Sequence, residues 1–573
     1  MINMKKLLAL LLAIVMVAGV LSACGSVPIE EGAPSNEQNG NSAENNEGGE
    51  GNEDIADSME AAEWTGEPVY GGHMNVHVYT KPEKLDASKT SGTWILPWAT
   101  CVWEGPLTRD ADHNIAPGVC DFELSEDQLT LKLWIREGGV KFNNGDDVDI
   151  YDVEASIARH TSGFAPAASK YVGKYIETMS VDDATQVLTI KFKSYNEKTM
   201  YYMASYKPWL GVWPKEMCEK YEGDLLIDQI EDCIGTGPYK VVEFEDGIQL
   251  TVARNEHYIP NAPGYTGFAA PKMAYLDSIT FWYNGDNASA TMALLNGDYD
   301  LTDVVHSDYM EMAEEQGIVR TSNPSIMGTG VIFNTRNTSV PVGAYPALRK
   351  AIMAAIDFEE FLSVVCDDSQ VIGNGLAILD EFATTRWEEQ DWFGDADQDV
   401  VDKYLEEAYA QGYNDEPITI VYTTTRDDIT TLLAGYMDDA GINCNVNQME
   451  TSVFSSFTAD TGNEWDVWFT WTNYAYYPGS LNDTLMVTYW KDNGREALTR
   501  KLEQAKIGTE EYNQAWEELE GLMIEECAYG HMGVIDWLWF HPETLHTDFE
   551  GTFPYLYNCF WEDPENHPSD YAS

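Results

Sequence analysis

The feature that most restricts the fold is an alternation of strand-like and helix-like segments over a body of roughly 500 residues, 67–573. In LTLKLWI, apolar residues recur at every second position, which is typical of a strand with one buried face. VLTIKFK repeats this pattern, and DIYDVEASIARH between them has helical spacing and an aspartate start signal. Because one hydrophobic core does not support a chain of this length, we expect two or three α/β lobes.

Three longer segments have the apolar spacing of amphipathic helices. Residues 347–365 are predicted to form one helix, as are residues 401–411 and residues 510–529. No internal repeat is visible, and the body contains no apolar run long enough to cross a membrane.

The N-terminus has the layout of a secretory signal. Lys5 and Lys6 precede an apolar run over residues 7–20, which is too short to be read first as a membrane span. The tetrapeptide LSAC, ending at Cys24, resembles the lipobox of bacterial lipoproteins, in which the cysteine thiol takes a diacylglyceryl group. We therefore expect a lipoprotein signal peptide over residues 1–23 and a two-chain lipid anchor at Cys24. The alternative is an ordinary secretory signal followed by a chance cysteine.

The segment after this cysteine, residues 24–66, is rich in Glu, Asn, Gly and Ser and contains neither Lys nor Arg. It has almost nothing apolar to bury, so its burial cannot offset the entropy lost on ordering. We expect a disordered acidic tether between the lipid and the folded body.

Charge and cysteine content restrict the partners and the redox chemistry. With 96 acidic and 33 basic residues, the formal net charge of −63 argues against binding to nucleic acid or adhesion to anionic lipid. Nine cysteines are present, and no C-x-x-C motif occurs. Buried free thiols and one or two disulfides are both possible for the eight that remain after Cys24: Cys101, Cys120, Cys218, Cys233, Cys366, Cys444, Cys527 and Cys559.

Motifs that would indicate an enzyme or a metal site are missing. The sequence has neither a G-x-S-x-G nucleophile elbow nor an H-E-x-x-H zinc helix. His73 and His77 are four residues apart, but the stretch between them alternates like a strand. In DADQDVVDKYLE, acidic residues fall at four calcium-loop positions, but Val400 stands where that loop needs glycine. Helix capping by acids explains the same residues, so we expect no catalytic residue, metal or cofactor.

Several segments follow one another in a recognisable order. The most specific are VKFNNGDDVDIYDV, then GTGPYKVVEF with the later ARNEHY, and then NGDYDLTD. This succession, over roughly residues 70–540, resembles the family 5 extracytoplasmic solute-binding proteins. These form the peptide/nickel group of binding proteins that serve ABC importers.

The resemblance implies an α/β fold, namely the two-lobed periplasmic-binding-protein fold of type II, large peptide-binder class, with an inserted third subdomain. Lobe I would comprise residues 67–321 and 511–573, with the insertion at about 101–225, and lobe II would comprise residues 322–510. It also implies a monomer that captures a small solute by hinge closure and delivers it to permease subunits at the extracytoplasmic face of the cell membrane.

The aromatic stretch WFTWTNYAYYPG, residues 468–479, falls where the resembling family has a cleft pattern close to W-x-x-D-Y-x-x-P. Trp471 matches the tryptophan, but Tyr474 occupies the aspartate position, whose carboxylate pairs with a peptide's α-amino group in many peptide binders. A shift of register could bring Asp466 or Asp483 there instead. Tyr and Trp offer stacking faces and polar hydrogens, which suit sugars, cations or hydrophobic side chains.

A second aromatic cluster, SGTWILPWATCVW, and the GTGPYK turn are expected at the same cleft by the family's order. Simple core packing is the alternative for the rings in both aromatic stretches. The predicted ligand-contacting residues are Trp94, Trp98, Thr236, Trp471, Tyr474, Tyr476 and Tyr477.

The predicted function is that of a lipid-anchored binding protein and not of an enzyme. Short peptides are the default ligand of the resembling family, oligosaccharides are the alternative because of the ring-rich cleft, and nickel chelates or other small organic solutes come third. A surface lipoprotein hydrolase is the alternative from another class, and it would need a nucleophile and a base.

Overall fold

The structure is a computed structural model that describes residues 66–572, apart from short gaps. The gaps are residues 79–84, 87, 89–95, 166–167, 206–207, 224, 304, 306–308, 367–369, 373–374, 377–381, 383, 424–426, 474–477, 479–484 and 548–555. The chain divides into two compact units, residues 1–49 and residues 50–573, and every described residue belongs to the second.

A four-stranded sheet contains the first strand of the body. Its order is β1-β10-β9-β8: β1 is His73–Val78, β10 is Ser278–Tyr283, β9 is Gln249–Arg254 and β8 is Tyr239–Glu245. β1 runs parallel to β10, and the other neighbours are antiparallel. The predicted strand at HMNVH is therefore confirmed, and Met74 and Val76 on β1 are buried in the hydrophobic cluster that this sheet covers.

A second four-stranded sheet, with the order β4-β5-β7-β6, is built from a separate stretch of the chain. β4 is Cys120–Leu124, β5 is Thr130–Ile135, β7 is Val187–Phe192 and β6 is Ile176–Asp182. The strands predicted at LTLKLWI and VLTIKFK are β5 and β7, and they pair directly in antiparallel register. Their inward residues belong to a hydrophobic cluster of their own, which draws on residues 107–212.

The helix predicted between these strands is α4, Ile150–Arg159. Asp149 caps its start, because the Asp149 side chain accepts hydrogen bonds from the backbone N–H groups of Tyr151 and Asp152. The Asp152 carboxylate accepts the Asp149 backbone N–H in return, which completes a capping box. The aspartate start signal in the sequence is thus confirmed.

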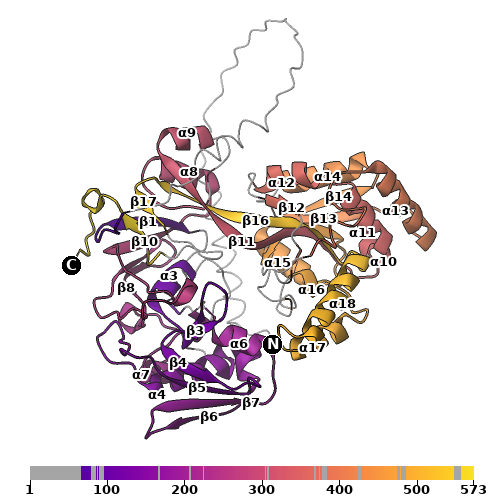
Figure 1. The fold of residues 1–573 in the computed structure, drawn as a ribbon. Coiled ribbons are helices and arrows are strands. Elements are labelled where there is room, and N and C mark those ends of the chain that lie inside the picture. The colour runs from indigo at the N-terminus through magenta and orange to yellow at the C-terminus, as the bar shows by residue number, and fades with distance from the viewer. Residues whose placement is uncertain are drawn as a thin grey trace, which may run out of the picture. The chain divides into compact units, whose positions relative to one another are not determined.

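The largest sheet has six strands in the order β12-β16-β11-β15-β13-β14. The strands are Gln370–Ile372 (β12), Tyr529–Pro542 (β16), Ile318–Phe333 (β11), Val467–Asn473 (β15), Ile418–Thr423 (β13) and Cys444–Met449 (β14). In Figure 1 the long strands β11 and β16 run side by side away from this sheet toward β1 and β10. They are much longer than their neighbours, so their far ends leave the six-stranded sheet.

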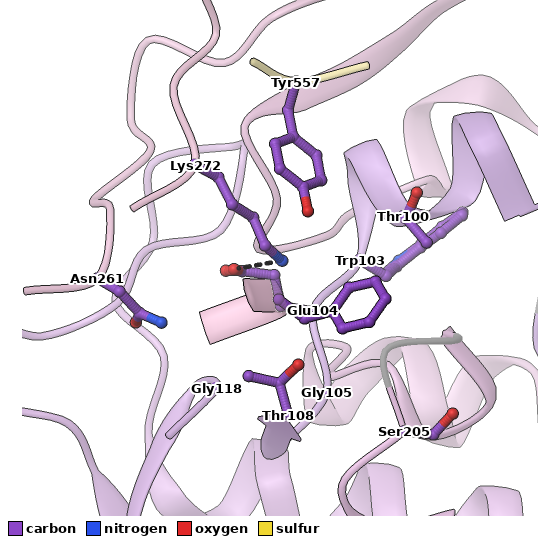
Figure 2. Close-up of a pocket in the computed structure, with 11 residues that line it drawn as sticks. Thr100, Trp103, Glu104, Gly105, Thr108, Gly118, Ser205, Asn261, Lys272 and Tyr557 are labelled. Atoms are coloured by element: carbon purple, nitrogen blue, oxygen red, sulfur yellow. Dashed lines mark ion pairs between the residues drawn. The ribbon is translucent and has the colours of Figure 1, made fainter. Parts of the chain in front are cut away.

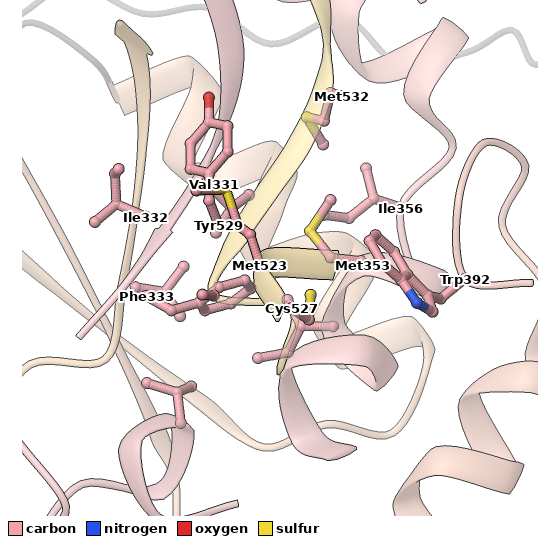
Figure 3. Close-up of a cluster of buried hydrophobic side chains, with 14 of the residues drawn as sticks. Val331, Ile332, Phe333, Met353, Ile356, Trp392, Met523, Cys527, Tyr529 and Met532 are labelled. Atoms are coloured by element: carbon pink, nitrogen blue, oxygen red, sulfur yellow. The ribbon is translucent and has the colours of Figure 1, made fainter. Parts of the chain in front are cut away.

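Helices cover the six-stranded sheet and enclose its core. They are α10 (Pro341–Ala344), α11 (Pro346–Ala354), α12 (Phe358–Cys366), α13 (Gln398–Gln411), α14 (Asp427–Asp439), α15 (Thr451–Ala459), α16 (Leu485–Thr488), α17 (Arg495–Gln504) and α18 (Glu510–Glu526). Figure 3 shows part of this core, in which Val331 and Phe333 of β11 lie among Met353, Met523 and Tyr529. Side chains from α11, α18, β11 and β16 therefore share one hydrophobic cluster. Along β16, the last buried member of this cluster is Ile535.

The remaining described α-helices and β-strands are short. They are α3 (Leu96–Val102), β2 (Leu107–Arg109), β3 (Ile115–Pro117), α6 (Glu197–Met203), α7 (Lys215–Lys220), α8 (Asn287–Leu295), α9 (Met310–Glu315), β17 (Leu545–His546) and β18 (Phe560–Trp561). Two single π-helical turns, η3 (His160–Phe164) and η4 (Ser169–Gly173), follow α4.

The single helix predicted over residues 347–365 is wrong in one respect, because the structure has two helices there. α11 ends at Ala354 and α12 begins at Phe358. Asp357 in the break accepts the backbone N–H of Glu360 at 2.9 Å, so it starts a new helix. The helical spacing of apolar residues continues through the break, so periodicity alone did not reveal that one helix ends and another begins.

The other two predicted helices are confirmed as α13 and α18. Asp397 caps α13 by accepting the backbone N–H groups of Asp399 at 2.9 Å and Val400 at 3.3 Å. Capping therefore explains Asp397, one of the acidic residues that resembled a calcium loop. α18 ends at Cys527, a non-glycine residue in the left-handed conformation with φ 43°.

The cysteines of the described part are free thiols. Six of them are buried, and Cys444 is half-buried. The alternative of buried free thiols therefore holds for six of these seven residues, whereas the side chain of Cys366 lies outside the described part.

Candidate functional site

The two long strands β11 and β16 connect two hydrophobic cores. Trp539 on β16 belongs to the core under the β1 sheet, whereas Ile535 belongs to the core of the six-stranded sheet. The β11–β16 ladder pairs Asn323 with Trp537 and resumes where Met327 pairs with Ile535, so β11 advances four residues while β16 advances two. Pro324 falls in this interruption and has no N–H for the ladder. The connection between the cores is therefore interrupted at a defined point.

The GTGPYK turn is packed against the end of α3. A Cβ atom at Gly235 would lie 2.1 Å from the backbone O of Val102, and one at Gly237 would lie 2.3 Å from the backbone O of Cys101. The Gly237 N–H donates to the Val102 carbonyl at 2.9 Å. Only glycine allows this close approach, so both glycines are explained by helix–turn packing.

Thr236, a predicted ligand contact between these glycines, is fully buried. Its Oγ1 accepts the backbone N–H of Glu104 at 3.2 Å. This hydrogen bond fixes the turn against the chain that follows α3. The Thr236 side chain is thus buried between the turn and the chain that follows α3. Its ligand contact stays a prediction.

Trp98, the second predicted contact that is described, lies on α3. Its side chain is buried at 2% exposure, and its ring centroid is 5.8 Å from that of Trp103 in an edge-on arrangement. The Trp103 ring in turn lies 6.0 Å from Trp213. These rings form part of the core under the β1 sheet. The ligand contact of Trp98 stays a prediction.

The aromatic stretch of residues 468–479 begins on β15. Trp468 packs edge-on against Phe454 at 5.1 Å, and Phe469 packs against Phe361 at 5.2 Å. Successive side chains alternate between the two faces of a strand, so both faces of β15 are in contact with helices here. The backbone of Trp471 pairs with Thr329 of β11, next to the interrupted part of the β11–β16 ladder.

Several predicted positions lie outside the described residues. The side chain of Trp471 is one of them, although its backbone is described. The others are Cys24, Trp94, Tyr474, Tyr476, Tyr477 and Asp483.

Asp466, which was an alternative acidic anchor for a peptide amine, has a structural role. Its side chain is 1% exposed. One carboxylate oxygen accepts the backbone N–H of Val342 at 3.0 Å, and the other accepts that of Thr419 at 2.9 Å. Burial raises the pKa of Asp466 to about 6 despite these two hydrogen bonds. The carboxylate thus joins β15 to α10 and β13 and presents no free oxygen to a ligand.

A small polar cavity missed by the sequence analysis lies between α3 and the loops below it (Figure 2). Its centre is an ion pair between Lys272 Nζ and Glu104 Oε1 at 3.1 Å. The Tyr258 hydroxyl donates to the same Glu104 oxygen at 3.2 Å, and Lys272 Nζ lies 5.2 Å from the Tyr557 ring. The cavity volume is about 20 Å³, which accommodates about one water molecule and no peptide.

Contacts also join the stretch of residues 107–212 to helices of the six-stranded sheet. Lys198 Nζ on α6 lies 3.2 Å from Glu503 Oε1 on α17, and this lysine side chain is 3% exposed. Lys506, just after α17, donates to the backbone O of Glu126 at 3.1 Å. These contacts therefore connect the stretch of residues 107–212 to the helices of the six-stranded sheet at a place other than β11 and β16.

Glu197, next to this lysine, is buried at the same contact. Its carboxyl is hydrogen-bonded to Tyr512 of α18. Burial is the main reason that the pKa of Glu197 rises to about 8. No sequence motif marks these residues, because the contact depends on how two distant helices meet.

The described residues contain neither a membrane-spanning helix nor a cluster of metal ligands. No described helix has the length and apolar character needed to cross a bilayer. Within the same residues, no group of three or more His, Cys, Asp or Glu side chains is arranged to hold a metal ion. His77 instead has its ring nitrogens within hydrogen-bonding distance of Thr302 Oγ1 and the Asn284 carbonyl.

Comparison with known proteins identifies the family. Residues 113–494 match the family model described as bacterial extracellular solute-binding proteins, family 5 middle. This match covers more than half of the chain, and the chain therefore belongs to that family. The resemblance drawn from the order of the sequence segments is confirmed. Family 5 proteins are extracytoplasmic solute-binding components of ABC importers that bind peptides or related ligands, and the family is not enzymatic.

The chain is also similar to a curated protein and to solved structures of binding proteins. Protein XP55 of Streptomyces lividans is 24% identical over 278 residues, which are 46% of this chain and 45% of that protein. The chain thus matches less than half the length of this curated relative. The substrate-binding protein CtaP of Listeria monocytogenes has a TM-score of 0.70 at 17% identity, with 86% of this chain and 99% of that chain covered.

The oligopeptide-binding protein AppA of Bacillus subtilis, solved in complex with a nonapeptide, has a TM-score of 0.67 at 15% identity. Here 86% of this chain and 100% of that chain are covered. These likenesses show the fold, which is the predicted type II periplasmic-binding-protein fold of mixed α/β class.

Proposed function

We propose that the chain is the lipid-anchored substrate-binding component of an ABC importer that captures short peptides. Two lobes, predicted at residues 67–321 with 511–573 and at residues 322–510, close around the peptide and present it to the permease. The mechanism is hinge closure, in which a few residues between rigid bodies absorb the change in backbone angles. No bond of the solute is broken.

The β11–β16 connection is the observation that carries this proposal. These two strands link the core containing Trp539 to the core containing Ile535, and their pairing is interrupted around Pro324. An interruption in a two-stranded connection is a place where bending breaks few hydrogen bonds. The contact of Lys198 with Glu503 lies elsewhere between the two bodies, so it could form and break as they close and open.

Short peptides are the favoured ligand class within this function. AppA, which shares the fold, was solved with a nonapeptide. In this chain Tyr474 replaces the acidic anchor, and both Asp466 oxygens are engaged by backbone N–H groups. We therefore propose that recognition relies on the peptide backbone and side chains more than on a free α-amino group. The same observation favours oligosaccharides as the second candidate, because rings without a carboxylate anchor suit sugar stacking.

Native mass spectrometry of the chain, purified without denaturation, tests the ligand class. A retained ladder of masses that differ by amino-acid residues supports the proposal. Increments of hexose or pentose would overturn the peptide assignment and favour the sugar alternative. If the protein is isolated without a ligand, titration with a peptide library and an oligosaccharide library decides between the two. Catalytic turnover of a bound solute would contradict the proposal, because a binding protein shows only stoichiometric saturation.

The lipid anchor has its own test. Replacement of Cys24 by Ser removes the thiol that would carry the diacylglyceryl group, so Cys24→Ser is expected to move the protein from the membrane fraction to the soluble extracytoplasmic fraction. Immunoblotting of fractionated cells measures this shift, and Cys101→Ser, which alters a buried thiol of the body, is the control. Equal membrane association of wild type and Cys24→Ser would exclude this anchor.

A further inference from the structure

A second pocket lies at the contact between residues 107–212 and α17, and none of the predicted cleft residues lines it. Its volume is about 260 Å³. The lining side chains come from η4 and the chain after it, from the start of α6, and from α17. They are Lys170, Tyr171, Lys174, Tyr175, Asn196, Lys198, Arg495, Thr499 and Glu503.

The charge of this pocket is opposite to that of the protein. Four of its side chains are cationic and one is a carboxylate, whereas the whole chain has 33 basic residues, 96 acidic residues and a net charge of −63. Like charges gathered in one pocket repel one another unless an anion compensates them. Glu503 compensates Lys198, with 3.2 Å between Oε1 and Nζ. Among the side chains that line the pocket, cations therefore outnumber the carboxylate.

Arg495 is the residue that points most directly to a ligand. Its side chain is 7% exposed, and its Nε–H is buried without a hydrogen-bond partner. Its guanidinium forms an ion pair with the half-exposed Glu496, whose Oε1 is 3.6 Å from Nη2, a separation longer than an ordinary hydrogen bond. A buried guanidinium with an unused donor is unfavourable unless an acceptor reaches it. Carboxylate and phosphate oxygens are the acceptors that match its geometry.

The two walls of the pocket are shaped for a small polar molecule. Arg495, Thr499 and Glu503 are spaced four residues apart, so they line one face of α17. On the opposite wall the Tyr171 ring has Lys170 Nζ at 4.6 Å and Lys198 Nζ at 5.1 Å from its centroid. The pocket thus combines cations, hydroxyl and amide groups, and an aromatic wall.

We propose that this pocket binds a small anion with two or more negative charges, carried by carboxylate or phosphate groups. Arg495 donates to one anionic group, and Lys170 and Lys174 stabilise another. A bound anion would touch both α17 and the elements before α6, so it would favour the arrangement in which they meet. This second step rests on the hinge closure proposed above, whereas the anion site itself does not.

Isothermal titration calorimetry of the full chain with citrate and with inorganic phosphate tests the site, at constant ionic strength and with acetate as the monovalent control. Saturable binding of citrate or phosphate is expected, with little response to acetate. Arg495→Gln should weaken that binding about tenfold, because a charge-assisted hydrogen bond is lost. Lys501→Gln is the matched control, because Lys501 lies on the same helix, pairs with Glu518 and does not line the pocket.

Lys174→Gln keeps the test decisive if Arg495→Gln does not fold, because Lys174 is exposed and no core depends on it. It should weaken anion binding about threefold. Absence of saturable binding up to on the order of 10 mM of either anion would overturn the proposal. So would equal affinities of wild type, Arg495→Gln and Lys174→Gln.

The coupling to closure is measured separately. By linkage, a saturating anion should raise peptide affinity by about fivefold in the wild type and not in Arg495→Gln. If the anion binds but peptide affinity does not change, the site stands and only its coupling is wrong. If no peptide binds at all, the proposed function fails while the calorimetric result for the anion is unaffected.

Discussion

Asp466 illustrates at the residue scale how an acidic side chain beside a predicted cleft can belong to the fold. Its two oxygens hold the backbone N–H groups of Val342 and Thr419, and its burial raises its pKa to about 6. Replacing it would leave two buried donors without an acceptor, which is costly. A carboxylate in this position therefore stabilises the six-stranded sheet, and ligand recognition has to use other groups.

Trp471 is the residue whose replacement best separates ligand binding from core packing. We expect Trp471→Ala to weaken peptide binding about tenfold, with less than about 1 kcal/mol lost from the free energy of unfolding. Trp468→Ala is the contrasting variant, because Trp468 packs against Phe454 at 5.1 Å and against Tyr489 at 6.4 Å. It should lower the free energy of unfolding by about 2–3 kcal/mol.

Urea denaturation and peptide titration of both variants measure these effects. If Trp471→Ala loses as much stability as Trp468→Ala and binds peptide normally, Trp471 is a core residue and the cleft assignment fails. If neither property changes, neither assignment holds for Trp471.

Glu197 is expected to make stability depend on pH. Its pKa is raised from 4.5 to about 8 chiefly by burial and further by Glu503, whereas Tyr512, Lys198 and Arg109 act in the opposite direction. Between these two pH values the folded protein holds a proton that the unfolded chain releases, so the contribution of Glu197 to stability falls as pH rises. One such proton corresponds to about 1.4 kcal/mol per pH unit.

Glu197→Gln keeps the neutral side chain at every pH. Its free energy of unfolding should match that of the wild type near pH 5 and exceed it by at least about 1.4 kcal/mol near pH 8. Glu123→Gln is the control, because Glu123 is exposed on β4 and pairs with Lys132 at the surface. Thermal and urea denaturation at a series of pH values gives the comparison. A constant difference between Glu197→Gln and the wild type at all pH values would contradict the assignment.

At the scale of elements, Arg349 fixes the end of α18 to α11. Its side chain is buried, and Nε donates to the carbonyls of Glu526 and Cys527 at 3.0 Å each. Nη1 also donates to the carbonyl of Val342. The last carbonyls of a helix have no partner inside the helix. One guanidinium thus satisfies the end of α18 and orients the chain that enters β16.

Replacement of Arg349 by Met should therefore destabilise the protein by about 2–4 kcal/mol, because several buried carbonyls lose their donor. Lys350→Met is the matched control: Lys350 is half-buried beside Tyr404 and should cost about 1 kcal/mol or less. Denaturant unfolding followed by circular dichroism measures both. Equal losses in the two variants would show that the α18 carbonyls do not depend on Arg349.

Local elements of this fold were predictable from the sequence where one interaction dominates. Alternation predicted β5 and β7, and the aspartate start signal at Asp149 predicted the start of α4. α13 begins at Gln398, three residues before the predicted start at residue 401. The break between α11 and α12 was missed because apolar spacing continues past Asp357. Periodicity reports only which face of a helix is buried, so it does not detect the point where α11 ends and α12 begins.

Features that depend on distant segments were not predictable in this way. The interruption at Pro324 requires knowledge of which strand pairs with β11, and the Glu104–Lys272 pair joins residues far apart in the chain. Thr236 illustrates the same limit, because its glycines indicated a turn but not that the turn packs against α3. The order of motifs gave the family, and the family, not local physics, gave the predicted cleft.

For the molecule as a whole, the contact between α6 and α17 is the place where the proposed closure of the two lobes can be tested. Glu503 and Lys198 form a 3.2 Å ion pair in which the lysine is almost fully buried. If the two bodies separate when peptide leaves, this pair must be broken and its charges rehydrated before release. Interactions of this kind act mainly on dissociation rates, since association depends on diffusional encounter.

We therefore expect Glu503→Gln to speed peptide dissociation about tenfold and to leave the association rate within about twofold of the wild type. Stopped-flow tryptophan fluorescence with the peptide identified by mass spectrometry gives both rates. Glu518→Gln is the control, because Glu518 pairs with Lys501 between α17 and α18 and does not reach α6.

The same substitution acts in the opposite direction on the anion pocket, because Glu503 is the one carboxylate among the described residues that line it. Glu503→Gln should bind citrate more tightly while it releases peptide faster, provided the peptide rates are measured without multivalent anions. Faster peptide release together with tighter citrate binding would assign two separate roles to this contact. Unchanged peptide release would show that the α6–α17 contact persists in the open form, and the hinge would then have to open elsewhere.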